Sequence, residues 1–177
     1  MPIIVCITPL LSAPVATIRQ IEESDIADFR EALDAVCRER KYLAAFEAPP
    51  IERVREFVTA NIEAGHPQFV AELDGALVGW CDAIPGSETA GTAHVGSLGM
   101  GVLKEYRSRK IGRQLLEATV ARAREVGIEK IELCVYCANE PAIALYRSFG
   151  FEEEGKRKHG RLVDGVYDDV LMMALHL

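Results

Sequence analysis

The sequence predicts a single α/β domain with four helices and a mixed, mostly antiparallel sheet of about seven strands. The predicted elements follow the order β, α, α, β, β, β, α, β, α, β, β, and a strand–helix–strand unit within this order requires a parallel pair of strands. Asp74-Gly75 and Asp164-Gly165 each separate two strand-like runs, which indicates antiparallel hairpins. A length of 177 residues, of which 49% are hydrophobic and 27% charged, fits one globular core.

The first third of the chain is predicted to hold a short strand and two amphipathic helices. The strand covers residues 17–21, and Ser24 or Asp25 can then cap a helix that continues to about Cys37. A second helix over residues 51–62 follows a pair of prolines, which favour a helix start.

Three strands are predicted next, over residues 69–73, 76–83 and 92–102. Trp80 in the second of them is expected in the core. The third contains three glycines, which weaken a strand unless a bulge or a close backbone approach requires them: Gly96, Gly99 and Gly101.

The most informative stretch joins the last of these strands to a helix. A polar loop over residues 104–110 leads into an amphipathic helix that begins at Ile111 and stops at Gly127. The first turn of a helix has backbone N–H groups without intrahelical partners and carries partial positive charge, so it favours an anion such as phosphate. Four cations add to this site: Arg107, Arg109, Lys110 and Arg113.

Residues 102–116 resemble the acetyl-coenzyme A binding motif of the GCN5-related N-acetyltransferase (GNAT) family, in which Gln/Arg-x-x-Gly-x-Gly/Ala wraps the pyrophosphate. Arg107 and Gly112 match the first and last motif positions. Lys110 stands where the middle glycine is usual. If this position requires a positive φ, a Cβ is unfavourable there; alternatively, the ammonium group reaches the phosphate.

A second segment strengthens the resemblance. A predicted strand over residues 131–136 is followed by residues 139–151, which resemble the family pattern Asn-x-x-Ala-x-x-Leu-Tyr-x-x-x-Gly-Phe. The final hairpin, with its last strand over residues 166–175, is similar to that of a subgroup acting on small amines, amino acids or protein N-termini. The likeness extends from about Thr17 to the C-terminus and is strongest over residues 95–151.

The resemblance implies a sheet with a central parallel pair, formed by residues 92–102 and 131–136. A bulge in the first of these strands splays the pair apart, and the gap admits the pantetheine arm of acetyl-CoA. An amide near Met100 would polarise the thioester carbonyl. Helix capping explains Asn139 as well as a pantetheine contact does. The implied coenzyme contacts are Met100, Val102, Arg107, Ser108, Arg109, Lys110, Ile111, Gly112, Arg113 and Asn139.

Attack by an amine requires a base, and departure of the thiolate requires an acid. Tyr146 resembles the family's acid, although a buried core aromatic is the alternative. His94 is the best candidate for the base because an unperturbed pKa of about 6.5 suits proton removal at neutral pH, while a structural hydrogen bond explains it equally well. Three weaker candidates are expected on solvated faces: Glu72, Asp82 and Glu105.

These features predict transfer of an acetyl group from acetyl-CoA to a primary amine of a small molecule, an amino acid or a peptide N-terminus, by direct attack on the thioester. The alternative is a non-catalytic acyl-CoA sensor, which Lys110 and the lack of a glutamate on the central strand permit. In the family the first two helices shape the acceptor pocket, so three residues between them are pocket candidates, with solvated connector residues the open alternative: Tyr42, Phe46 and Glu47.

Composition limits the other classes of function. A net charge of -7 argues against a general nucleic-acid or membrane-surface binder. Five cysteines without framework spacing indicate reduced thiols and a cytoplasmic protein, and Cys134 and Cys137 form no predicted metal site. Residues 1–15 are expected to be an irregular extension without a secretory signal, and residues 16–177 the single acetyltransferase domain. No metal is expected, and a homodimer is left open.

Overall fold

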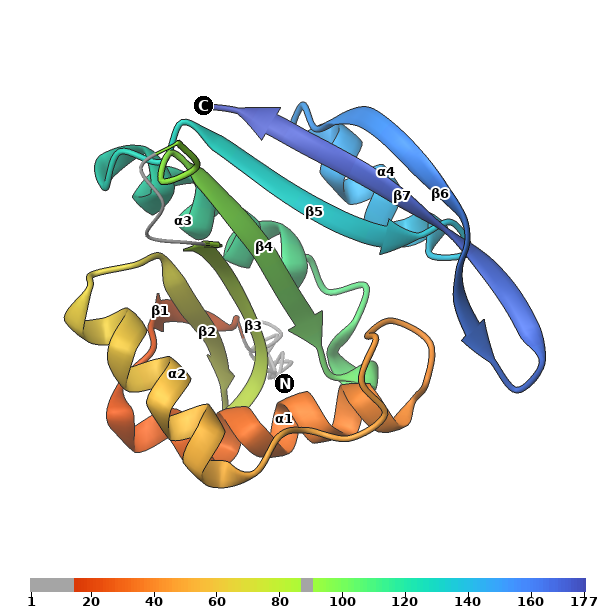
Figure 1. Ribbon diagram of the computed structural model, residues 1–177. Helices are drawn as coiled ribbons and strands as arrows, with labels where there is room; N and C mark the ends of the chain where they lie inside the picture. Colours follow the sequence, from red (N-terminus) through yellow and green to blue (C-terminus); the bar gives the residue numbers. More distant parts are fainter. Residues whose placement is uncertain (1–14, 87–90) are drawn as a thin grey trace, which may run out of the picture.

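The computed structural model of the chain describes residues 15–86 and 91–177. Its strands form one seven-stranded sheet in the order β1-β2-β3-β4-β5-β7-β6 (Figure 1). The predicted irregular extension falls, except for Val15, outside the described residues.

The strands are β1 (Thr17–Gln20), β2 (Gln68–Leu73), β3 (Ala76–Pro85), β4 (Val95–Val102), β5 (Lys130–Tyr136), β6 (Glu152–Val163) and β7 (Val166–His176). The α-helices are α1 (Ile26–Arg38), α2 (Ile51–Glu63), α3 (Ile111–Glu125) and α4 (Glu140–Ser148). Single turns of 3₁₀ helix, η1 and η2, occupy Glu23–Asp25 and Lys104–Tyr106. The order of strands and α-helices is the one that the sequence predicts.

All strand pairs are antiparallel except β4 and β5, which are parallel. Their pairing is short. It begins at Val95↔Lys130 and ends at Ser97↔Glu132, after which the two strands separate. The predicted splayed parallel pair is therefore present at the centre of the sheet.

Two helical layers cover the two faces of the sheet. Figure 1 shows α1 and α2 in front of the sheet and α3 and α4 behind it. Trp80 of β3 packs against the first layer, with its ring 5.7 Å from that of Phe29 and nearly perpendicular to it. The adjacent Cys81 belongs to the second core, together with Leu115 and Tyr146, because successive strand residues point to opposite faces.

Two expectations about the third predicted strand are wrong. It begins at Val95 rather than at residue 92, because residues 92–94 form a turn in which the Val95 amide donates to the Thr92 carbonyl. No bulge interrupts its pairing with β3, which is in continuous register from Gly79↔Val102 to Pro85↔Gly96.

Close approach accounts for two of the glycines instead. A Cβ on Gly101 would collide with the indole ring of Trp80, and one on Gly99 would lie 3.0 Å from Oδ1 of Asp82. Side chains of β3 therefore lie across the backbone of β4. In the described part of the chain, no helix is long and apolar enough to cross a membrane.

Candidate active site

The loop before α3 contains two residues in the left-handed backbone region. Ser108 has a φ of 63° and Lys110, which immediately precedes α3, has a φ of 64°. The usual glycine position is thus one that needs a positive φ, and a lysine there carries a backbone cost of about 1–2 kcal/mol.

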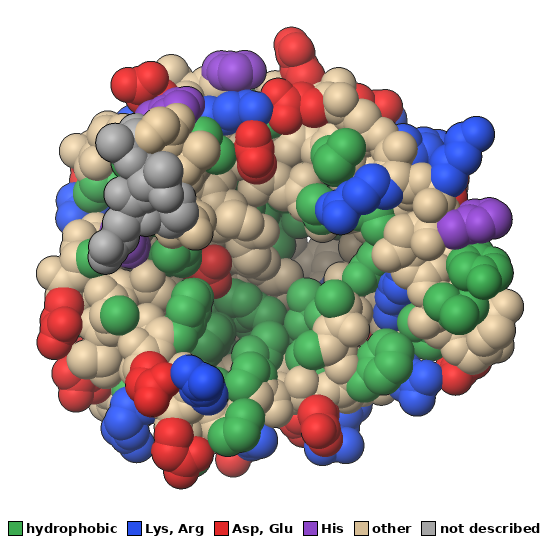
Figure 2. All heavy atoms as spheres, in the orientation of Figure 1, with side chains coloured by type: hydrophobic (Ala, Val, Ile, Leu, Met, Phe, Trp, Pro, Cys, Tyr) green, Lys and Arg blue, Asp and Glu red, His purple; other side chains and the backbone are tan. Residues whose placement is uncertain are grey.

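The first turn of α3 lies close to the splayed strand. Ile111 is buried, and a Cβ placed on Gly112 would be 3.4 Å from the Met100 methyl group and 3.6 Å from Leu145 of α4. The first turn of α3 therefore lies against the end of β4 where the loop begins. Figure 2 shows the surface hollowed between the diverging ends of β4 and β5, with hydrophobic side chains beside the hollow.

Two of the four predicted phosphate-binding cations are already paired. The Arg107 guanidinium pairs with both carboxylate oxygens of Glu39, and its Nε donates to the Val102 carbonyl at 2.9 Å. It also lies over the Tyr42 ring, with its central carbon 4.7 Å from the ring centroid. Arg113 donates to Ser148 Oγ at 2.8 Å.

Arg109 and Lys110 differ from these two. Neither forms an ion pair within residues 15–86 and 91–177, and Arg109 lies 5.3 Å from the centre of the Tyr106 ring. Of the four predicted cations, they are the two best able to meet a phosphate. Arg107 instead ties the loop to the end of α1.

Asn139 caps α4, because its Oδ1 accepts a hydrogen bond from the Ala142 amide at 3.4 Å. This observation supports the capping interpretation. A contact between Asn139 and pantetheine stays a prediction.

Tyr146 lies on α4 with only 6% of its surface exposed, and its ring packs against Phe151 with centroids 5.6 Å apart. Burial, together with the nearby Cys81 thiol, raises the pKa of its hydroxyl well above the usual range. Tyr146 therefore stays protonated at neutral pH. This is the state that a proton donor to a departing thiolate requires.

Asp82 was expected on a solvated face, and this expectation is wrong. It is 8% exposed and lies on the face of β3 that carries Trp80, directly opposite Gly99 of β4. Burial raises the pKa of the Asp82 carboxyl to about 7, while a hydrogen bond from the Gly99 backbone acts in the opposite direction. Sequence reasoning missed this environment because it depends on a glycine in another strand.

His94 is exposed in the turn before β4. Its carbonyl accepts hydrogen bonds from the amides of Glu129 and Lys130, so it lies at the end of the parallel pair where the strands are still joined. At about 3.3 Å per residue along a strand, its backbone lies about 17 Å from that of Gly99. The structure therefore separates His94 from the part of β4 near Met100 and Tyr146.

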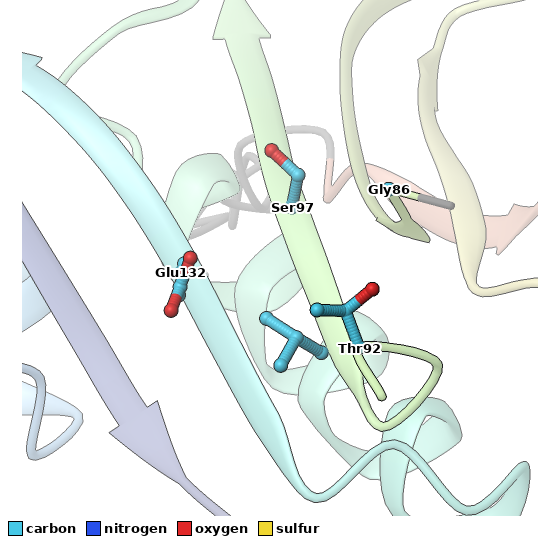
Figure 3. Close-up of a pocket in the computed structure, with 5 residues that line it drawn as sticks. Gly86, Thr92, Ser97 and Glu132 are labelled. Atoms are coloured by element: carbon cyan, nitrogen blue, oxygen red, sulfur yellow. The ribbon is translucent and has the colours of Figure 1, made fainter. Parts of the chain in front are cut away.

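A pocket of about 330 Å³ lies next to this joined end. Figure 3 shows Ser97 on β4 and Glu132 on the neighbouring β5, with Thr92 at the start of the turn. The Glu132 carboxylate lies 2.7 Å from Lys130 Nζ. The pocket thus has polar side chains along one wall, and its remaining lining residues are Gly86 and Val95.

The edge strand β6 contacts the segment between α1 and α2. Arg161 of β6 donates to the carbonyls of Arg40 at 2.6 Å and Lys41 at 3.2 Å, and it lies over the Tyr136 ring. Phe46 lies under the Arg40 guanidinium. The β6–β7 hairpin therefore contacts the connector that carries the pocket candidates Tyr42 and Phe46.

Comparison with known proteins assigns this architecture. A model of the acetyltransferase (GNAT) family matches residues 27–151. The chain belongs to the GNAT acetyltransferase family. It is 32% identical over 111 residues to L-amino acid N-acetyltransferase AaaT of Escherichia coli K12, a match that covers 62% of this chain and 68% of the relative.

Another GNAT relative is the N-alpha-acetyltransferase of Sulfurisphaera tokodaii, with 36% identity over 139 residues, 72% of this chain and 75% of the relative. Among solved structures, the putative acetyltransferase yncA of Salmonella typhimurium, determined with its cofactor acetyl-CoA, superimposes with a TM-score of 0.85 at 20% identity. That match covers 91% of this chain and 93% of the other. The protein is an N-acetyltransferase of the GNAT family, whose acyl donor is acetyl-CoA.

Within residues 15–86 and 91–177, no cluster of three or more side chains could hold a metal ion, and the four cysteines found there are free thiols.

Proposed function

We propose that the protein transfers the acetyl group of acetyl-CoA to the α-amino group of an amino acid or of an N-terminal residue, by direct attack of the amine on the thioester. The observation that carries this proposal is the strand pair that opens directly beside the start of α3. The acceptor class is supported by the activities for which AaaT and the Sulfurisphaera tokodaii relative are named.

In this proposal the coenzyme pyrophosphate binds at the first turn of α3. The free amides of that turn supply hydrogen bonds, and Arg109 and Lys110 supply charge that no ion pair in the described residues neutralises. The pantetheine arm lies in the gap between β4 and β5, where unpaired strand edges offer amide and carbonyl groups. The Met100 amide polarises the thioester carbonyl.

Catalysis needs one proton removed from the amine and one given to sulfur. Tyr146 is proposed as the acid, and its burial on α4 beside the open strands supports that role. His94 stays a prediction as the base. Its distance along β4 would require water molecules to carry the proton.

The acceptor is tested by measuring release of coenzyme A over a panel of amino acids, N-terminal peptides, polyamines and aminoglycosides. We expect turnover with α-amino acids or N-terminal peptides at rates well above those with the other two classes. Turnover confined to polyamines or aminoglycosides would contradict the acceptor class. Tight binding of acetyl-CoA with no turnover on any amine would favour a sensor.

A further inference from the structure

We propose that the Asp82 carboxylate is the group that takes the proton from the attacking amine. This inference rests on the proposed acetyl transfer and assigns to that reaction a residue on β3. It differs from the prediction for His94, which lies in the turn before β4.

The position of Asp82 along the sheet is the first argument. Asp82 pairs with Gly99, and its neighbour Cys81 pairs with Met100. Tyr146 lies beside Cys81 in the core on the α3 and α4 face, while Asp82 points to the α1 and α2 face. The buried phenol and the buried carboxyl therefore flank the same part of β4 from opposite faces.

The second argument is the direction in which the carboxyl lies. An added Cβ on Gly99 would be 3.0 Å from Oδ1 and 3.4 Å from Oδ2 of Asp82, so the carboxyl occupies the space above that glycine. The parallel pairing of β4 ends two residues earlier, at Ser97. Asp82 thus reaches over β4 at the level where the gap for the acyl-pantetheine arm has opened.

The electrostatic surroundings agree with this role. Burial and the Gly99 backbone set the pKa of Asp82 near 7, without a contribution from any charged group in the described residues. The neutral Gln68 lies opposite Asp82 on β2. Its buried side-chain amide has no hydrogen-bond partner among the described residues.

Other titratable groups nearby are the Cys81 thiol, whose pKa burial raises, and His66, whose pKa burial lowers. On β5, Glu132 pairs with Ser97 at the last position where β4 and β5 are still joined, and Lys130 engages its carboxylate. A carboxyl that titrates near neutral pH and is held by no cation within the described residues can accept a proton and return it to solvent.

The proposed step balances as follows. The amine nitrogen forms a bond to the thioester carbonyl carbon, and a proton on that nitrogen passes to the Asp82 carboxylate. The carbon–sulfur bond then breaks, and the departing sulfur takes the Tyr146 hydroxyl proton. The products are the amide and the coenzyme thiol, and transfer of one proton through water from the carboxylic acid to the phenolate restores both residues.

The test compares Asp82→Asn with wild type on an amine that wild type acetylates, and measures the dependence of kcat/KM on pH. We expect kcat/KM to fall about 10²–10⁴-fold, the contribution typical of a positioned proton acceptor. The acetyl-CoA dissociation constant should change less than about twofold, because Asp82 makes no predicted contact with the pyrophosphate. The acidic limb near pH 7 should give way to one set by the amine's own pKa.

Asp74→Asn is the matched control, since this exposed aspartate lies in the turn between β2 and β3 and its φ of 52° suits asparagine. It should leave kcat/KM unchanged. Gly99→Ala is a second variant that keeps the carboxyl but displaces it, and it should lower kcat by about tenfold or more with the fold intact. It supplies the test if Asp82→Asn does not fold.

An Asp82→Asn enzyme with near-wild-type kcat/KM and an unchanged acidic limb would overturn the inference. So would loss of that limb in His94→Ala with its retention in Asp82→Asn. Failure of the proposed acceptor class is measured separately, by the substrate preference of wild type over the amine panel. The ratio of kcat/KM between variant and wild type tests Asp82 with whichever amine the enzyme accepts. A wild-type protein inert toward all amines would contradict both.

Discussion

The proposed acid role of Tyr146 can be tested by removing its hydroxyl oxygen alone. Tyr146→Phe keeps the ring that packs against Phe151 and deletes the hydroxyl. If the hydroxyl protonates the thiolate, kcat should fall about 10²–10⁴-fold with little change in affinity for acetyl-CoA. Steady-state kinetics under conditions where chemistry limits the rate provide the measurement. Turnover close to wild type would exclude Tyr146 as an essential acid.

Lys110 combines a strained backbone with a charge that has no ion-pair partner among the described residues, so substitution should change two properties in opposite directions. Lys110→Gly removes a left-handed lysine and should raise the free energy of unfolding by about 1 kcal/mol, or the melting temperature by about 2–4 °C. Loss of the ammonium group should weaken acetyl-CoA binding about tenfold. Calorimetry and thermal unfolding measure the two effects. Unchanged or tighter binding would show that the lysine is only tolerated.

The raised pKa of Asp82 also predicts how stability depends on pH. A carboxyl whose pKa is about 7 when folded, and about 3.9 when unfolded, binds more protons in the folded state between these values. Stability is therefore lost as pH rises from about 4 to about 7. Asp82→Asn removes this loss. The free energy of unfolding of the variant minus that of wild type should therefore be larger at pH 8 than at pH 5, by a few kcal/mol at most.

Thermal unfolding of both proteins across this pH range measures the difference. The exposed Asp74→Asn variant should show no such trend. A constant difference between Asp82→Asn and wild type from pH 5 to pH 8 would contradict a raised pKa.

The coenzyme-binding role of residues 102–112 and the acid role of Tyr146 could be predicted from the sequence, because their motifs are local and their spacing is fixed. The environment of Asp82 could not be assigned in this way. It depends on Gly99, seventeen residues later in the chain, which leaves space for the carboxyl only when β3 and β4 pair in their observed register. For the same reason the ion pair between Arg107 and Glu39 was not foreseen.

At the scale of elements, this ion pair joins the coenzyme loop to α1. The side chains of Arg107 and Glu39 are 29% and 20% exposed, so their interaction is partly shielded from solvent. Glu39→Gln should lower the free energy of unfolding by about 1–2 kcal/mol, because a partly buried guanidinium loses its charged partner. It should also speed hydrogen exchange in residues 104–110.

The matched control is Glu56→Gln, which removes an ion pair with Arg53 on α2 whose side chains are 75% and 67% exposed. That change should cost no more than about 0.5 kcal/mol. Equal effects of the two substitutions, or no change of exchange in the loop, would contradict the proposed tie between loop and helix.

Element boundaries were predicted best where periodicity is strong. The helices expected at about 25–37 and 51–62 are Ile26–Arg38 and Ile51–Glu63. The start of β4 was misplaced by three residues because Thr92, Ala93 and His94 continue an alternating pattern that a turn interrupts. The bulge was expected from glycines that instead admit Asp82 and Trp80.

At the scale of the whole molecule, the sheet brings distant segments to one place. The position of β7 between β5 and β6 puts the C-terminal hairpin beside the central pair, and Arg161 then reaches the connector after α1. Such an arrangement depends on long-range pairing, which local sequence patterns do not specify. The prediction that the central parallel strands splay apart came from the resemblance to the GNAT family and not from periodicity.

The central claim is that acetyl-CoA donates its acetyl group to an α-amine bound at the gap between β4 and β5. The most direct measurement incubates the protein with acetyl-CoA and the best amino acid or peptide acceptor, and quantifies free coenzyme thiol and acetylated product together by thiol titration and nuclear magnetic resonance. We predict equal amounts of thiol and product, with the acetyl group on the α-nitrogen. Thiol release without an acetylated amine, or acetyl found only on a side-chain nitrogen, would contradict it.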